Sequence, residues 1–125
     1  MDKTAGIRPS ARLVGVEGEM YAAFALQKKG LRVVARNSRS QYGEIDLIAL
    51  DGEFLAFIEV KTWPAHGLEN LSYGITRKKQ QRIIETAKYF LAMHQEYCNK
   101  SIRFDVIYLH PGESMVHLVS AFTES

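Results

Sequence analysis

The sequence has a single cysteine, Cys98, among its 125 residues, so no disulfide can form within the chain. A lone cysteine suits a reducing compartment, and its position late in a helical pattern favours core packing over reactivity. No apolar run approaches the roughly 18 residues that a membrane span needs. The opening residues, MDKTAGIRPSAR, lack the apolar core of a signal peptide. We therefore expect a cytoplasmic protein with no membrane partner.

The composition is 46% hydrophobic and 24% charged, as in ordinary globular proteins. The length fits one domain, which we place at residues 10–125 after a flexible N-terminal tail over residues 1–9. The net charge of only +2 hides two basic segments, one over residues 26–42 and one over residues 76–88. Such segments are either solvated surface or a contact for an anionic partner, and composition alone leaves both interpretations open.

Hydrophobic periodicity and turn signals predict an α/β protein. A hairpin signal at Asp51-Gly52 joins two of the apolar runs. The predicted elements are helices over residues 10–29 and 76–97, strands over residues 31–37, 45–50, 54–62, 102–109 and 115–119, and a long loop over residues 63–74. The order helix, three strands, helix, two strands predicts one mixed β-sheet flanked by helices.

Four charged residues interrupt the two strands of this hairpin. Strand side chains alternate between faces, so Glu44 shares a face with Asp46, and Glu59 shares a face with Lys61. A four-residue loop would set Asp46 directly opposite Glu59, and a two-residue loop would make them diagonal neighbours. Like charges in directly opposed positions repel, with Cβ atoms about 4.5–5.5 Å apart. The acids therefore either bind a divalent cation together or form ion pairs at a sheet edge, where charges discourage aggregation.

The metal interpretation names specific ligands. Carboxylates of Asp46 and Glu59 and the backbone carbonyl of Val60 are hard oxygen donors, which suit Mg²⁺ or Mn²⁺. Lys61 would stand where it can orient an attacking water or neutralise charge on a phosphate. This combination is typical of phosphodiester hydrolysis.

The first predicted helix carries a further acid, Glu19, on or beside its buried stripe. The glycines Gly15 and Gly18 cost this helix roughly 2 kcal/mol of propensity, which indicates close approach to a neighbouring backbone. Such an approach would let Glu19 reach the acids of the hairpin. The alternative is a solvated helix residue.

Several short motifs lie along the chain in a fixed order: GVEGE at 15–19, RN at 36–37, GEID at 43–46, FIEVK at 57–61, RKKQQR at 77–82 and FDV at 104–106. With these motifs the sequence resembles the YraN-like family of uncharacterised bacterial proteins. That family is similar to the Holliday junction resolvase branch of the PD-(D/E)xK nuclease superfamily. GEID followed by EVK is the most specific part of the resemblance, which covers roughly residues 15–109.

The resemblance implies a restriction-endonuclease-like fold and a nuclease that hydrolyses DNA with Mg²⁺ or Mn²⁺, including branched or single-stranded DNA. It implies Asp46 and Glu59 as metal ligands, Lys61 as the catalytic lysine and Glu19 as an accessory acid. Resolvase-like nucleases that cut two strands usually act as homodimers, so it also implies a homodimer. The family usually has arginine two residues after the lysine, whereas this sequence has Trp63, which either stacks on a base or anchors the loop by packing.

The basic segments are predicted to hold the nucleic-acid backbone through Arg36, Arg39, Arg77, Lys78, Lys79 and Arg82. Such binding reads few bases and weakens strongly with salt. Two rival interpretations remain: a non-catalytic nucleic-acid-binding module with the same fold, and a structural protein whose acids are ion-paired. Asp105 is expected to support the structure, and the four histidines show no metal-ligand spacing.

Overall fold

The computed structural model describes residues 11–62, 75–109 and 115–124, with side chains from Gly18 onward. The predicted loop over residues 63–74, with Trp63, lies outside the described residues. The elements are α1 (Ala11–Lys28), β1 (Arg32–Ser40), β2 (Gly43–Asp51), β3 (Phe54–Thr62), α2 (Arg77–Met93), the short 3-10 helix η2 (Gln95–Tyr97), β4 (Ser101–Leu109) and β5 (Met115–Phe122). The predicted order of helices and strands is confirmed.

Two strands, β1 and β5, continue well past their predicted C-terminal ends, and β2 is longer than predicted at both ends. β1 continues to Ser40 and β5 continues to Phe122. Each contains a non-glycine residue with positive φ, Asn37 at 52° and Ser120 at 54°. Positive φ kinks the backbone at these positions, and the strand resumes beyond the kink.

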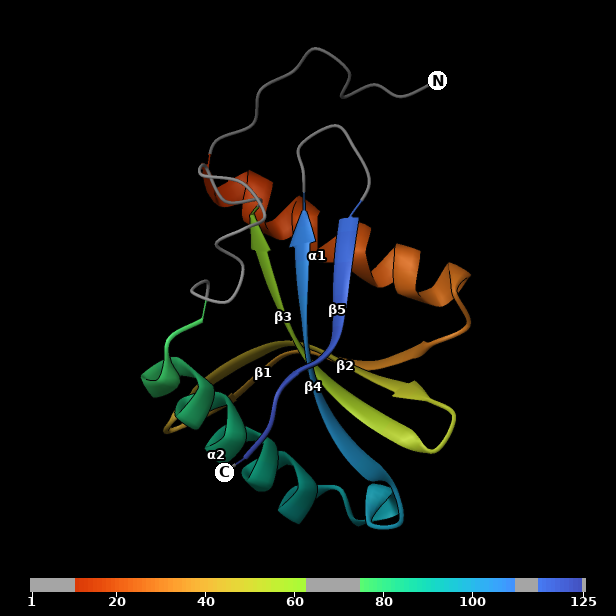
Figure 1. Cartoon of the computed structure of the whole chain (residues 1–125), viewed down its shortest axis with the longest axis vertical. Coiled ribbons are helices and arrows are strands. Elements are labelled where there is room, and N and C mark those ends of the chain that lie inside the picture. The colour runs from red at the N-terminus through yellow and green to blue at the C-terminus, as the bar shows by residue number, and fades with distance from the viewer. Residues whose placement is uncertain (1–10, 63–74, 110–114, 125) are drawn as a thin grey trace.

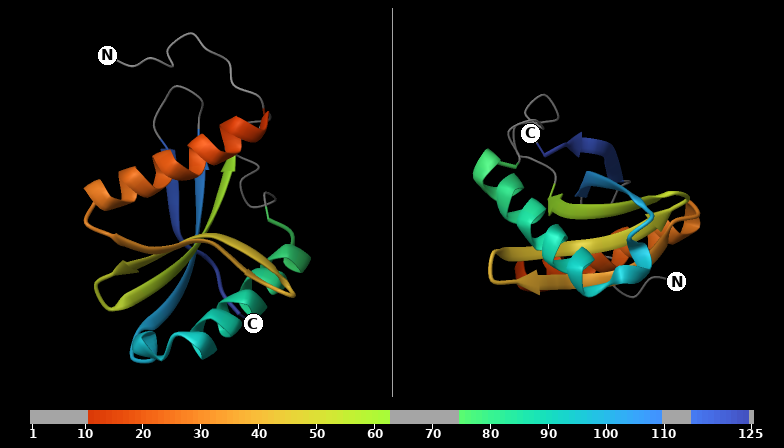
Figure 2. Two further views of the ribbon diagram at one scale, coloured as in Figure 1. Left: turned by 180° about the vertical axis from the view of Figure 1, so that it is seen from behind. Right: turned by 90° about the horizontal axis from the view of Figure 1, so that it is seen from below.

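The five strands form one mixed sheet in the order β1-β2-β3-β4-β5. Only β3 and β4 run parallel, and α2 lies in the connection between them. The two helices pack on opposite faces of the sheet, α1 on one and α2 on the other, as the views in Figure 1 and Figure 2 show. The fold is thus a helix–sheet–helix sandwich with a strongly twisted sheet. Neither α1 nor α2 combines the length and the apolar composition that crossing a membrane requires.

Each face of the sheet has its own hydrophobic core. Beneath α2, Phe57 of β3 meets Phe90 edge to face, with ring centroids 5.9 Å apart. Beneath α1, Leu26 packs with Ile58 of β3. β3 therefore supplies alternate residues to both cores, which fixes which of its side chains face α2.

The second helix is shorter than predicted. It ends at Met93, and His94 is its C-cap, with the ring stacked on Phe90 at 3.9 Å between centroids. Cys98 follows the 3-10 turn and is exposed. The prediction that Cys98 packs in the core is wrong, because the helical pattern that would have buried it stops before it.

A buried ionic network lies on β4 and β5. Asp105 is fully buried and accepts hydrogen bonds from Arg103 Nε at 3.0 Å and from the Ser120 N–H at 2.9 Å. His117 Nε2 lies 2.8 Å from its carboxylate. These partners lower the pKa of Asp105 against the opposing effect of burial. Asp105 thus has the supporting position that the sequence predicted.

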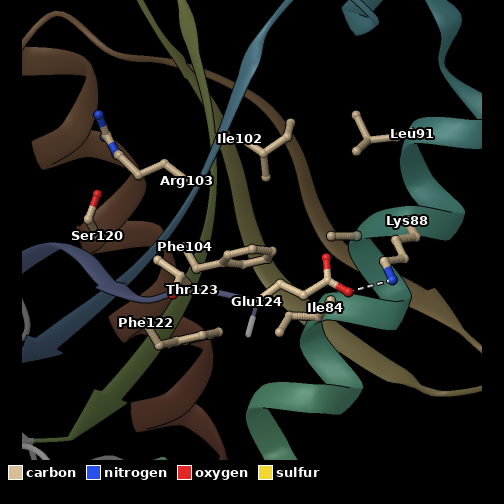
Figure 3. Close-up of a pocket in the computed structure, with 11 residues that line it drawn as sticks. Ile84, Lys88, Leu91, Ile102, Arg103, Phe104, Ser120, Phe122, Thr123 and Glu124 are labelled. Atoms are coloured by element: carbon tan, nitrogen blue, oxygen red, sulfur yellow. Dashed lines mark hydrogen bonds and ion pairs between the residues drawn. The ribbon is translucent and has the colours of Figure 1, made fainter.

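A surface pocket of about 270 Å³ lies between the later part of α2 and the neighbouring strands β4 and β5 (Figure 3). Apolar side chains such as Leu91, Ile102 and Phe122 line it. An ion pair between Lys88 Nζ and Glu124, at 2.7 Å, closes one side. The pocket adjoins the start of β4, whereas Glu59 of β3 pairs with Val106 in the second half of β4.

Candidate functional site

The turn between β2 and β3 determines which charged residues face each other. The strands pair Asp51 with Phe54 around Gly52, which has φ of 60°, and Glu53. The turn has two residues but begins one residue later than an Asp51-Gly52 turn. The register is therefore the one that sets Asp46 directly opposite Glu59. The paired residues end one step earlier, at Leu47 and Ile58.

The regular pairing ends there because the side chain of Asp46, and not a backbone carbonyl of β2, accepts the next N–H of β3. The Val60 N–H donates to Asp46 Oδ2 at 2.8 Å. The regular alternation of β2 also breaks at this point, since Ile45 and Ile48 both pack in the core beneath α2. The expected shared face of Glu44 and Asp46 is therefore not a simple consequence of strand periodicity, and Glu44 lies exposed.

Glu59 is buried beside this break, with only 7% of its surface exposed. Burial and then the charge of Asp46 raise its pKa to about 7, although Lys79 acts in the opposite direction. Lys79 Nζ lies 2.6 Å from Glu59 Oε2. The acid thus sits where a carboxylate is hard to ionise, and one ammonium group partly compensates.

Glu19 joins these acids from α1. A Cβ added to the adjacent Gly18 would lie 2.7 Å from Leu109 Cδ1 at the end of β4, so the close neighbour of this glycine is a side chain and not the backbone that the sequence predicted. Burial and then the charge of Asp46 raise the pKa of Glu19. Glu19 and Glu59 are therefore both affected by the charge of Asp46, and we call these three acids the carboxylate site.

An amide from β1 contacts the edge of this site. With its side-chain nitrogen facing the acids, Asn37 donates to Glu19 Oε1 at 3.0 Å and to Glu44 Oε2 at 2.9 Å. The positive φ of Asn37 falls between the pairs that join Arg36 to Leu47 and Ser38 to Ile45. The kink in β1 thus lies beside Asp46, and the amide holds two acids that would otherwise repel each other.

Lys61 lies two residues beyond Glu59, on the same face of β3 by strand alternation. It pairs in register with Tyr108 of β4 and is partly exposed. The position of Lys61 beside the acids stays a prediction.

The basic residues divide into two kinds. Arg77, Lys78 and Arg82 are exposed on the first turns of α2, whereas Lys79 turns toward Glu59. Thr76 caps this helix by accepting the Lys79 N–H at 3.1 Å.

The turn between β1 and β2 packs against the same part of α2. Ser40 Oγ lies 2.8 Å from Thr86 Oγ1, and a Cβ on Gly43 would lie 3.6 Å from Arg82 Cβ. The two basic segments, which the sequence could not connect, are therefore adjacent at this turn. Arg36 and Arg39 are exposed on β1, and Arg39 Nε lies 3.8 Å from Glu44.

Sequence reasoning missed two members of the site. Asn37 was noted only as part of a motif, and Lys79 was expected to contact phosphate rather than an acid. For Lys79 a signal was available, because cations crowd the start of α2, where the helix dipole favours anions. The ion pair with Glu59 accounts for one of them.

The donors can be tested against the metal that the sequence implied. Among the side chains that the structure describes, no three His, Cys, Asp or Glu residues group closely enough to hold a metal ion. The predicted ligand set needs only two carboxylates, from Asp46 and Glu59, and the carbonyl of Val60. These are oxygen donors of the kind that Mg²⁺ and Mn²⁺ prefer, and the crowding of negative charge favours a cation. The donor chemistry fits a divalent metal, with Lys79 as the present partner of Glu59.

Comparison with known sequences places the chain among relatives of similar length. Residues 18–109 match the model of the family described as "Uncharacterised protein family UPF0102". A UPF0102 protein of Nitrobacter winogradskyi is 40% identical over 119 residues, which cover 95% of this chain and 99% of the relative. A UPF0102 protein of Rhodopseudomonas palustris is 41% identical over 94% of this chain and 86% of the relative. A UPF0102 protein of Treponema pallidum is 40% identical over 90% of this chain and 94% of the relative. The chain belongs to family UPF0102.

Proposed function

We propose that this protein is a metal-dependent nuclease that hydrolyses phosphodiester bonds in DNA, with branched and single-stranded DNA among its substrates. One observation carries the proposal: Glu19, Asp46 and Glu59 lie together where the pairing of β2 with β3 ends. Burial and the charge of Asp46 raise the pKa of Glu59 to about 7. Perturbed acids that share one site are characteristic of functional centres.

Each residue of the site has a role in this proposal. Asp46, Glu59 and the Val60 carbonyl would hold Mg²⁺ or Mn²⁺, and the Val60 N–H bond orients Asp46 for this task. When bound, such a metal activates a water molecule and neutralises charge on the phosphate. Lys61 stabilises the negative charge that develops on the phosphate oxygens. Glu19, held by Asn37, supplies a third acid at the edge of the site.

The surface around the site suits an anionic polymer. Exposed Arg77, Lys78 and Arg82 follow the start of α2, and the β1–β2 turn brings the first basic segment beside them. Contacts of this kind hold the phosphate backbone without reading bases. A homodimer would present two such surfaces to the two strands of a branched substrate.

The test separates metal binding from chemistry. Asp46→Asn should abolish both Mn²⁺ binding and DNA cleavage, because the amide lacks the ligand charge but can still accept the Val60 N–H. Lys61→Ala should keep Mn²⁺ binding and lose cleavage. Both variants should still bind DNA. Calorimetric Mn²⁺ titration and cleavage assays on linear, single-stranded, flapped and four-way DNA measure these effects, with Glu53→Gln in the exposed hairpin turn as the control.

The ion pair between Lys79 and Glu59 favours a second candidate, a nucleic-acid-binding module without catalysis. Lys79 already compensates Glu59 without any metal. A wild-type protein that binds DNA but neither binds Mn²⁺ nor cuts any of these substrates would support the binding module and refute the nuclease.

A further inference from the structure

Lys79 behaves differently from the other cations at the start of α2. Its ammonium lies 2.6 Å from Glu59 Oε2, and 43% of its side chain remains exposed, against 8% for Glu59. The preceding residues, Arg77 and Lys78, face solvent. Lys79 thus reaches from the surface into the carboxylate site, while its neighbours remain outside.

We propose that Lys79 is an exchangeable counter-ion of the carboxylate site: it pairs with Glu59 in the absence of metal, and a divalent cation bound by Asp46 and Glu59 displaces it. The inference rests on the proposed function, because it requires that these acids bind a metal. It adds a residue that tunes metal affinity without being a ligand.

The exchange follows from charge and mobility. A divalent cation held by Glu59 would stand beside the Lys79 ammonium, and like charges at such short range repel each other. Asp46 is held by the Val60 N–H and Glu59 is buried, so neither ligand is free to move away. Lys79 has a flexible stem and a half-exposed side chain, so its ammonium can return to water at small cost. Lys79 is therefore the group that moves.

Lys79 lies on the same first turns of α2 as the exposed Arg77, Lys78 and Arg82. Metal binding would then add one cation to the surface proposed to hold DNA, which would couple the metal and the nucleic acid.

The experiment compares Mn²⁺ binding to four full-length, metal-free proteins by calorimetry: wild type, Lys79→Gln, Lys79→Arg and Lys78→Gln. Lys79→Gln should bind Mn²⁺ about tenfold more tightly than wild type, because the competing charge is gone. Lys79→Arg, which keeps the charge, should stay near wild type. Lys78→Gln removes the same charge from the adjacent exposed position and should change the affinity by no more than about twofold.

A second measurement uses the unmodified protein, so it does not depend on the folding of any variant. Saturating Mg²⁺ should increase the rate at which an amine-reactive reagent acetylates Lys79, followed by mass spectrometry, and should leave the rate at Lys78 unchanged.

The outcomes distinguish the two proposals. If wild type binds Mn²⁺ and Lys79→Gln matches Lys78→Gln or binds more weakly, the exchange is refuted and the nuclease proposal stands. An unchanged acetylation rate at Lys79 under saturating Mg²⁺ also refutes the exchange. If none of the four proteins binds Mn²⁺, both proposals fail.

Discussion

The carboxylate site should make the protein less stable as the pH rises from about 5 to 7. Glu59 has its pKa raised from 4.5 to about 7, first by burial and second by the charge of Asp46. A carboxyl with a raised pKa in the folded state holds its proton more tightly there than in the unfolded chain. Its stabilising contribution is therefore complete below pH 4.5 and is lost as the pH rises through 7.

The magnitude follows from proton linkage. Between the two pKa values the folded protein holds one more proton than the unfolded chain, so the free energy of unfolding falls by about 1.4 kcal/mol per pH unit. Across the whole interval the loss approaches about 3 kcal/mol. Glu19, whose pKa is also raised, acts in the same direction. Asp105 has a lowered pKa, so its contribution is lost only in more acidic solution.

The assay is urea unfolding of wild type and Glu59→Gln in chelator-treated buffer from pH 5 to 8.5. Glutamine keeps the shape and can still accept from Lys79 but cannot ionise. The variants should have similar stability at pH 5, and Glu59→Gln should be the more stable by about 3 kcal/mol at pH 8.5. Glu53→Gln, at an exposed turn position, should follow wild type throughout. If Glu59→Gln is equal to or less stable than wild type at pH 8.5, the reasoning from burial and repulsion is refuted.

Two further predictions test the contact between α1 and β4 beside the site and the basic surface around the site. Gly18→Ala should change stability in urea unfolding by no more than about 1 kcal/mol, because Leu109 Cδ1, 2.7 Å from the added Cβ, is the end of a flexible side chain that can shift and alanine favours the helix; a loss of about 3 kcal/mol would show that Leu109 is held in place. Arg82→Ala should weaken DNA binding and reduce the slope of log affinity against log salt by roughly 0.9. Lys100→Ala, outside both basic segments and bonded to the Gly52 carbonyl, should leave that slope unchanged, and equal slopes for both variants and wild type would remove Arg82 from the DNA surface.

The fold could be predicted from the sequence because its signals are local. Helical spacing defined α1 and α2, and the Asp51-Gly52 signal located the hairpin to within one residue. The ends of β1 and β5 were missed because Asn37 and Ser120 adopt positive φ within a strand. Asparagine adopts positive φ more often than most residues, but neither residue type predicts positive φ within a strand, where it depends on the surrounding contacts.

The candidate site could be predicted in part. Direct opposition of Asp46 and Glu59 was one of two arrangements that the sequence left open, and the turn at Gly52-Glu53 selects its register. The pairing of Lys79 with Glu59 depends on where α2 crosses the sheet, and the contact of Asn37 with Glu19 depends on where α1 crosses it. Both contacts depend on how the helices pack on the sheet, and the hydrophobic periodicity of one sequence does not predict that packing.

Two buried carboxylates of the same sheet show what distinguishes the carboxylate site from structural ion pairs. Asp105 on β4 is completely buried, yet Arg103, His117 and the Ser120 N–H surround it, and its pKa is lowered. Glu59 on β3 has one ammonium partner and a neighbouring acid, and its pKa is raised. An acid retained for stability alone would be expected to have the first environment, because an uncompensated buried charge costs free energy. The environment of Glu59 is the one that an added cation would improve, and this asymmetry within one sheet favours a binding role for its acids over a structural one.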